Sequence, residues 1–416
     1  MSGISRTGAW ALLEQISMPT LQLALTAPLI FSLGLTGYGL WSFNLSLAGI
    51  LGAATPGVAM AATQLISSEA DPTRRSAAIG LIVFGGLGVS VLSSIVALAL
   101  SGAVLHYYPP LVWVENHLNV AKFTSLAALT AASLQWDMMC AATLRAQSRF
   151  RENALCEIST RIFSIICLAS AGVLGASLIY LLIINLLCTV MRGGVKAIVA
   201  MRGIHGYSIQ LAVSLVPQAV HFSLLQWVNN LSSLLYSSAD RIVLGYFVPA
   251  GTVAIASLCG EMNQQIQSLP RAYFSPILPE LIRLNRSQDR NGFAGLVESG
   301  AKKLGRIVLF LSISSLACGP FLVMALTQSG LGYTDVIGIY SSYAVSYAAI
   351  AMIIIPYFSL IGRGELQYAN LLTIGGAVAN LVAALVLGSL AGAVGVALGR
   401  VFYTVPFMIW RKRART

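Results

Sequence analysis

The stretch Asn229-Asn-Leu-Ser-Ser-Leu-Leu-Tyr-Ser-Ser-Ala-Asp240-Arg241-Ile-Val-Leu-Gly245-Tyr-Phe-Val-Pro249-Ala-Gly251-Thr-Val-Ala-Ile-Ala-Ser257 decides the fold of this chain. In it a hydrophobic segment ends in the charged pair Asp240–Arg241, a Gly/Pro turn follows, and a second hydrophobic segment begins. This pattern predicts a helical hairpin that crosses a bilayer twice. Residues 27–43 show the same design, because a glycine-rich turn joins two long apolar runs. The two hairpins begin about half the chain apart, which predicts one unit used twice.

The composition is that of a membrane protein with many spans. Hydrophobic residues make up 57% of the chain, charged residues 9%, and the mean hydropathy is +0.80. An ordinary soluble domain carries roughly a quarter charged residues. The net charge of +11 could suggest nucleic acid, but the basic residues fall in short loops between apolar runs. We interpret them as determinants of topology and expect no nucleic-acid partner.

Runs long enough to span a bilayer fill nearly the whole sequence. They predict an all-α protein with about twelve transmembrane helices, with ends uncertain by several residues, at 9–33, 40–66, 77–105, 120–144, 155–174, 177–199, 209–235, 252–275, 304–326, 336–361, 366–387 and 391–409. Alternate connections hold almost all the positive charge, so we expect both termini and the longest connection, 279–303, to be cytoplasmic. We expect two parallel six-helix lobes, residues 1–203 and 204–416, around a central cavity.

Ionisable groups inside a span cost about 2.5–3.5 kcal/mol each on insertion scales, so each is a candidate for function. Glu157 and Arg161 are four residues apart with the acid first, which favours an ion pair on one helix, with a substrate contact as the alternative. Glu261 and Arg271 are close to three helical turns apart and share a face with Gln264 and Gln267. This polar stripe predicts a helix that lines a water-filled cavity.

Arg271 therefore has two readings, a contact to an anionic substrate or an arginine that extends to the inner interface. Glu14 and Asp137 each lie within about two turns of the cytoplasmic side, where water can reach them. Each could exchange a proton or bind a cation during transport, or could hydrogen-bond to a local partner.

The sequence shows no arrangement typical of an enzyme. It has no Ser/His/Asp set and no nucleotide motif, and its six cysteines lack the spacing of metal ligands. We expect no cofactor, no metal and no catalytic residue. The energy source would then be an ion gradient or the substrate gradient, which indicates a secondary transporter.

Two parts of the chain resemble a known family. Residues 238–247 followed by 251–257 resemble the seventh-to-eighth span signature of Wzx-type polysaccharide-unit flippases, and residues 371–381 and 392–400 resemble their eleventh and twelfth spans. The length, the number of spans and the inside termini are similar to that family along the whole chain.

The resemblance implies a member of the multidrug/oligosaccharidyl-lipid/polysaccharide (MOP) superfamily in the bacterial inner membrane. It would flip an undecaprenyl-pyrophosphate-linked oligosaccharide, such as an O-antigen unit of lipopolysaccharide, by alternating access. A pyrophosphate needs cationic donors, and Arg271, Arg161 and Arg400 are the available ones, with Gln264 and Gln267 beside them. Glu14, Asp137 and Glu261 would couple transport to H⁺ or Na⁺. A polysaccharide polymerase and a chain-length regulator are implied partners besides membrane lipids.

Two alternatives stay open. A drug/cation antiporter of the same superfamily would have a net acidic cavity, and here the embedded arginines are about as numerous as the acids. A membrane polymerase acting on the same lipid-linked sugars would carry a sizeable outer loop with its catalytic groups, and the predicted outer loops are all short.

Overall fold

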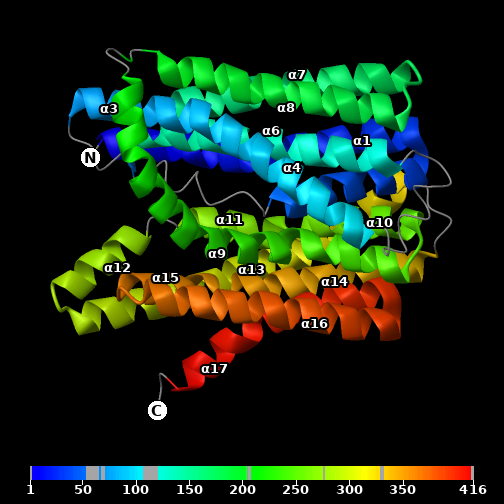
Figure 1. Ribbon diagram of the computed structural model, residues 1–416. Helices are drawn as coiled ribbons and strands as arrows, with labels where there is room; N and C mark the ends of the chain where they lie inside the picture. Colours follow the sequence, from blue (N-terminus) through cyan, green and yellow to red (C-terminus); the bar gives the residue numbers. More distant parts are fainter. Residues whose placement is uncertain are drawn as a thin grey trace. The chain divides into compact units, whose positions relative to one another are not determined.

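The computed structural model describes residues 2–52, 65–66, 71–105, 120–202, 204, 208–274, 277–327 and 332–413. Within these ranges the chain is α-helical and contains no strand, so the prediction of an all-α membrane protein is confirmed (Figure 1). The chain forms two compact units, unit 1 of Met1–Leu234 and unit 2 of Leu235–Thr416. The expected lobes, 1–203 and 204–416, stay a prediction.

The helices of unit 1 pack mainly around α6. They are α1 (Ser2–Gly52), α3 (Pro72–Gly80), a π-helical turn (Leu81–Gly85), α4 (Gly86–Leu105), α6 (Val120–Ala146), α7 (Phe150–Val173), α8 (Leu178–Met201) and the first part of α9 (Ile209–Phe247). Helix α6 contacts α1, α4, α7 and α8, and α7 and α8 lie side by side (Figure 1). The charged residues of these helices are thereby brought to a common interior.

The turn near the N-terminus is confined to one residue, Gly34, rather than extending over the whole glycine-rich stretch. Helix α1 is broken at Gly34, whose φ of 68° and ψ of 175° suit glycine, and the helical conformation resumes directly after it. The Thr26 and Tyr38 hydroxyls lie 3.4 Å apart on the two sides of the break. A straight helix would separate these residues by about 18 Å, so the chain doubles back at Gly34 as a hairpin.

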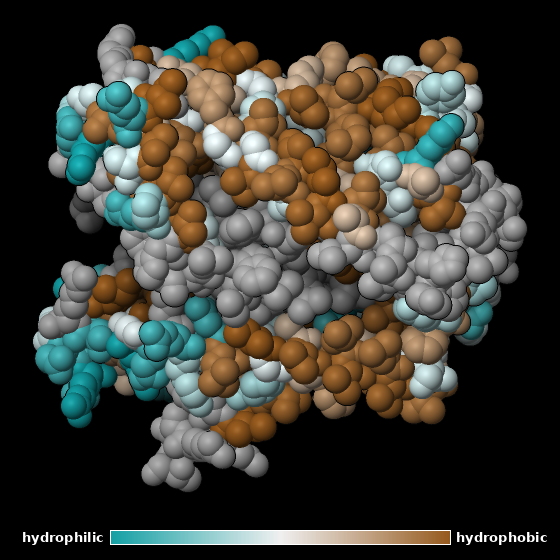
Figure 2. All heavy atoms as spheres, viewed as in Figure 1, coloured by the Kyte–Doolittle hydropathy of each residue, from teal (hydrophilic) through white to brown (hydrophobic). Residues whose placement is uncertain are grey.

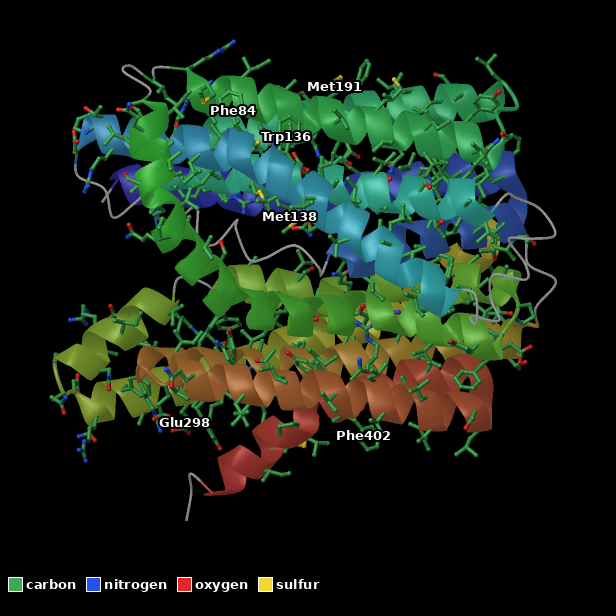
Figure 3. All side chains as sticks on the ribbon, in the orientation of Figure 1. Phe84, Trp136, Met138, Met191, Glu298 and Phe402 are labelled. Carbon is green, nitrogen blue, oxygen red and sulfur yellow. The ribbon has the colours of Figure 1, made fainter. Side chains whose placement is uncertain are left out.

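Trp136 of α6 contacts both the π-helical turn that precedes α4 and helix α8. The π-helical turn Leu81–Gly85 departs from the regular α-helical ladder, and the Val83 carbonyl within it accepts a 2.9 Å hydrogen bond from Trp136 Nε1 of α6. The other face of the indole lies against α8, because a Cβ on Gly193 would come within 2.7 Å of Trp136 Cε3. Figure 3 labels Trp136 inside unit 1.

Trp136→Phe should lower the free energy of unfolding by about 1–3 kcal/mol, because the Val83 carbonyl loses its donor and the smaller ring leaves part of the indole's space unfilled. Unfolding of the purified protein in mixed micelles, followed by fluorescence, measures this loss. Tyr180→Phe is the control, since that side chain is 65% exposed and its replacement should change nothing. A Trp136→Phe variant as stable as the wild type would contradict the prediction.

Unit 2 holds the remaining helices. They are the end of α9, α10 (Ala250–Asn263), α11 (Gln265–Phe274), α12 (Ile277–Arg286), α13 (Arg290–Thr327), α14 (Tyr333–Ala351), α15 (Ile354–Gly362), α16 (Leu366–Gly399), a 3₁₀ turn (Arg400–Thr404) and α17 (Val405–Arg413). Helix α14 contacts α10, α11, α13 and α16. The tenth predicted span is two helices, α14 and α15. The connection expected at 279–303 is also helical, because α12 and the start of α13 occupy it.

The hairpin that opened the sequence analysis differs from its prediction in one respect. Helix α9 continues past Asp240–Arg241 to Phe247, and the turn comes at Pro249, the N-cap of α10. The charged pair therefore lies inside the helix, about two turns before its end. A charged pair can stay inside an apolar helix when other helices supply its partners.

The last two predicted spans correspond to two helical segments joined by a sharp break, with the break inside α16. Ala391 and Gly392 have non-helical backbone angles, and Gly392 has a φ of 54°. A Cβ on Gly395 would meet the Leu387 carbonyl oxygen at 1.8 Å, so the segments before and after the break touch backbone to backbone. Glycine at this position permits that close approach.

Seven helical segments of the described chain are long and apolar enough to cross a membrane. They are Thr20–Gly52, Pro72–Val96, Phe150–Val173, Leu178–Met201, Arg290–Thr327, Tyr333–Gly362 and Gln367–Ile409, and four of them cover a break or a turn. Large hydrophobic side chains are exposed on them, for example Phe31 at 87% and Phe310 at 69%, and Figure 2 shows hydrophobic residues over much of the visible surface. The chain is a multi-pass membrane protein.

Candidate functional site

Five charged side chains meet inside unit 1 and form what we term the charge cluster. They are Asp137 of α6, Glu157 and Arg161 of α7, and Arg192 and Lys196 of α8. Arg192 Nε lies 2.8 Å from Asp137 Oδ2, and Lys196 Nζ lies 2.7 Å from Asp137 Oδ1. Lys196 therefore bridges the acid of α6 and Glu157 of α7, with which it also pairs. The three helices are tied together by charge in their interior.

Glu157 is the second acid of the charge cluster. Arg161 Nε lies 2.7 Å from Glu157 Oε1, as the spacing of four residues predicts, and Arg192 Nη1 lies 3.7 Å from the same oxygen. Arg192 and Lys196 are also four residues apart, so both project from the face of α8 that meets α6 and α7. The close approach of α8 to α6 at Gly193 lets their charges reach Asp137.

The charge cluster carries more positive than negative charge. Lys196 is 1% exposed and Glu157 3%, whereas Arg161 is 26% exposed and is the member that a ligand can reach. Among the side chains that the structure describes, three cations face two carboxylates, so full ionisation of these five groups leaves an excess of one positive charge. Removing charge from water is costly unless it is paired, and the excess therefore favours an anion beside Arg161.

The charge cluster lies toward one end of its helices. Asp137 is about two and a half turns before the end of α6, Glu157 about two turns after the start of α7, and Lys196 about one and a half turns before the end of α8. At this end Arg149 Nη1 donates to the Val199 carbonyl at 2.7 Å. The last turn of α6 carries Arg145 and the first turn of α7 carries Arg151, so the positive-inside rule predicts that this end is cytoplasmic.

A second buried ion pair lies in unit 2. Arg400 Nη1 pairs with Asp240 Oδ2, and the two side chains are 2% and 6% exposed. The Arg400 guanidinium carbon lies 4.7 Å from the centre of the Tyr347 ring, and the Tyr343 hydroxyl is 3.4 Å from the same carboxylate oxygen. Arg400 is thus held between an acid of α9 and two rings of α14.

Arg241 is paired as well. Its Nη2 lies 2.9 Å from Glu261 Oε1 of α10, and both side chains are partly exposed. The partners seen for Asp240 and Arg241 come from other helices or helical turns. The physical reason is that α9 extends to Phe247 and carries the pair past α10.

The other residues expected at the site occupy the α10–α11 segment. Gln264 separates the two helices and is exposed, Gln267 is half-buried, and Arg271 is exposed on α11. The structure places Glu261 beside Arg241. The side chain of Glu14 lies outside the described residues. The roles assigned to these residues from the sequence stay predictions.

Sequence reasoning missed two members of the charge cluster. Lys196 is one of the basic residues near span ends that the sequence analysis interprets as determinants of topology, and Arg192 has no acid four residues away on its own helix to mark it as part of a pair. The available signal was their spacing of four residues on either side of Gly193-Gly194 within an apolar run. Two cations on one face of an apolar helix need acidic partners, and Asp137 and Glu157 are acids inside other predicted spans.

No protein-family model and no curated protein matches this chain. Solved structures do. The chain is similar to a multidrug resistance MATE family transporter of the MOP superfamily in an inward-facing conformation, with a TM-score of 0.75 and 14% identity over 97% of this chain and 98% of that one. It is similar to the lipid II flippase MurJ in an inward closed conformation, with a TM-score of 0.73 and 13% identity over 98% and 87%.

A third likeness is to a mutant of a Vibrio cholerae MATE transporter, with a TM-score of 0.63 and 14% identity over 99% of this chain and 96% of that one. The proteins in these three structures are transporters or flippases. At these identities the likeness establishes the fold, and this chain therefore has the fold of MOP superfamily transporters.

Proposed function

We propose that this protein is a flippase that moves an undecaprenyl-pyrophosphate-linked oligosaccharide, such as an O-antigen or related repeat unit, across a bacterial inner membrane. The observation that carries the proposal is the charge cluster, in which cations outnumber carboxylates. A diphosphate with two or more negative charges matches such an excess, whereas a cationic drug would face repulsion. Both termini would be cytoplasmic, and the polyprenyl tail would stay in lipid.

Two arginines are assigned to the diphosphate. Arg161 is the most exposed cation of the charge cluster, and Arg271 is exposed on α11 beside the polar Gln264 and Gln267. An arginine offers several N–H donors in a fixed plane and binds phosphoryl oxygens in pairs. Arg400 is already engaged with Asp240, so its contribution to the substrate would be indirect.

Arg271→Ala and Arg161→Gln should each slow transport by about tenfold or more, because each removes a charge-assisted contact to the diphosphate. The assay uses proteoliposomes that contain a lipid-diphosphate oligosaccharide. A sugar-modifying enzyme added outside measures how fast the oligosaccharide becomes accessible. Arg283→Ala is the matched control, because this arginine is 66% exposed and, among the described residues, its ion pair is with Glu280 of the same helix.

Each outcome of this assay is decisive. Protein-dependent transfer that falls in both variants and persists in the control supports the function and the site together. Transfer that both variants leave intact keeps the function and removes the two arginines from the site. Absence of transfer with a matched sugar, together with ion-driven efflux of a cationic dye, would establish the drug/cation antiporter instead.

The driving ion is proposed to act on acids of the two units. Asp137 belongs to the charge cluster and Glu261 pairs with Arg241, so a proton taken up by either would release a cation from its ion pair. Glu14 is the third acid assigned to this role. Imposing a pH gradient or a Na⁺ gradient separately on the same proteoliposomes identifies the ion.

A further inference from the structure

Unit 2 contains a cavity of about 1000 Å³ that the proposed function does not use. Its walls come from the end of α12, the first half of α13, and α15. One end of the lining is apolar, with Leu304, Met352, Ile355 and Pro356, and the other end carries Arg290 and Arg363. A cavity of this size can hold a drug-sized molecule, and its lining suits one with a polar and an apolar end.

The charges of the lining are not equivalent. Glu298 lies 2.7 Å from Lys302, and an Asp289 oxygen accepts a 2.9 Å hydrogen bond from the Gly292 N–H, so both acids are engaged. Within the described part of the chain, neither Arg290 nor Arg363 forms an ion pair. The cavity therefore offers positive charge to a ligand.

The position of Arg363 adds a geometric argument. Its guanidinium carbon lies 5.6 Å from the centre of the Phe293 ring, which also lines the cavity. Stacking on a ring orients a guanidinium while leaving its N–H edge available. Gln288 contributes an amide to the same end of the lining. These groups are donors of the kind that phosphoryl oxygens accept.

The depth of the cavity identifies the kind of ligand. Helix α13 has 38 residues and is about 57 Å long, against about 30 Å of hydrocarbon in a bilayer. Its residues 307–327 carry no charge and are long enough to cross, and Leu309, Phe310 and Ile313 are 59–69% exposed. The apolar end of the cavity at Leu304 therefore borders the hydrocarbon, and the wall runs from there toward Arg290 on the polar side of the membrane interface.

The surface around the cavity agrees with this depth. Hydrophilic residues gather around α12, and hydrophobic residues follow along the other helices of unit 2 (Figure 2). Glu298, which marks the cavity wall, lies at this hydrophilic end (Figure 3).

We propose that this cavity binds an anionic glycerophospholipid of the membrane, with the headgroup phosphate between Arg290 and Arg363 and an acyl chain running past Leu304 and Met352 toward the exposed apolar face of α13. The apolar floor favours a lipid over free phosphate, because only a lipid fills both ends of the cavity. The site belongs to unit 2 alone and does not depend on the substrate that the protein carries.

The test is native mass spectrometry of the full-length protein in detergent, titrated with dioleoyl phosphatidylglycerol or dioleoyl phosphatidylcholine. The wild type should bind the anionic lipid about tenfold more tightly, and Arg290→Gln combined with Arg363→Gln should abolish that preference. The matched control, Arg74→Gln with Arg75→Gln, removes the same charge from α3 of unit 1 and should retain it. Ala294→Trp places a large ring in the lining of the cavity and should weaken binding of both lipids.

Melting curves without added lipid show whether the variants are folded, and only variants that melt like the wild type are compared. A preference for phosphatidylglycerol that survives both the double variant and Ala294→Trp would overturn the proposal. Displacement of the lipid by millimolar inorganic phosphate, with equal affinity for lipids of short and long chains, would also overturn it, because the cavity would then be a phosphate site without a place for the chain.

Discussion

Lys196→Met should lower the free energy of unfolding by about 2–3 kcal/mol, because Asp137 and Glu157 each lose a buried charged partner while Arg192 and Arg161 still pair with them. Lys196 is the most deeply buried cation of the charge cluster, and like Arg192 it pairs with both acids. Methionine keeps most of the side-chain volume, so the loss reports charge rather than a cavity. Unfolding of the purified protein in mixed micelles, followed by fluorescence, measures it.

Two further variants define the cause. Asp137→Asn combined with Lys196→Met removes one charge of each sign and should cost less than the sum of the two single variants. Lys302→Ala breaks an ion pair whose side chains are 66% and 70% exposed, and its cost should stay within about 1 kcal/mol. If Lys196→Met is no worse than Lys302→Ala, the charge cluster does not hold α6, α7 and α8 together.

Arg400→Met should cost about 3–5 kcal/mol, since Asp240 would be left buried without its cation. Arg400→Lys should lose about 1–2 kcal/mol, because the charge stays while the planar contact with Tyr347 is lost. Asp240→Asn combined with Arg400→Met should recover part of the stability lost in the single variant. The same unfolding measurement applies.

The transport assay separates structure from binding at Arg400. If Arg400 only supports the fold, the folded Arg400→Lys variant should transport at the wild-type rate. If that variant is as stable as the wild type and yet transports at least tenfold more slowly, Arg400 contacts the substrate, as the sequence suggested, and the ion pair with Asp240 opens during transport.

Local patterns predicted much of the fold. The apolar runs gave an all-α membrane protein, and the glycine-rich stretch around Gly34 marked the first hairpin. The pair Glu157–Arg161 was readable because both partners lie on one helix, where a spacing of four residues fixes their proximity. The ends of helices were predicted less accurately from the sequence. Asp240–Arg241 resembled a helix end only because the partners that keep the pair inside α9 are distant in the sequence.

The sequence by itself determined the class of protein and the identity of the charges inside the apolar segments, because hydropathy and helical periodicity act over a few neighbouring residues. Only the tertiary structure decided which charges meet. Asp137 and Lys196, or Asp240 and Arg400, are joined by the packing of helices far apart in the chain. Because these side chains are buried, each charge needs a partner of opposite sign, since an unpaired charge removed from water destabilises the fold.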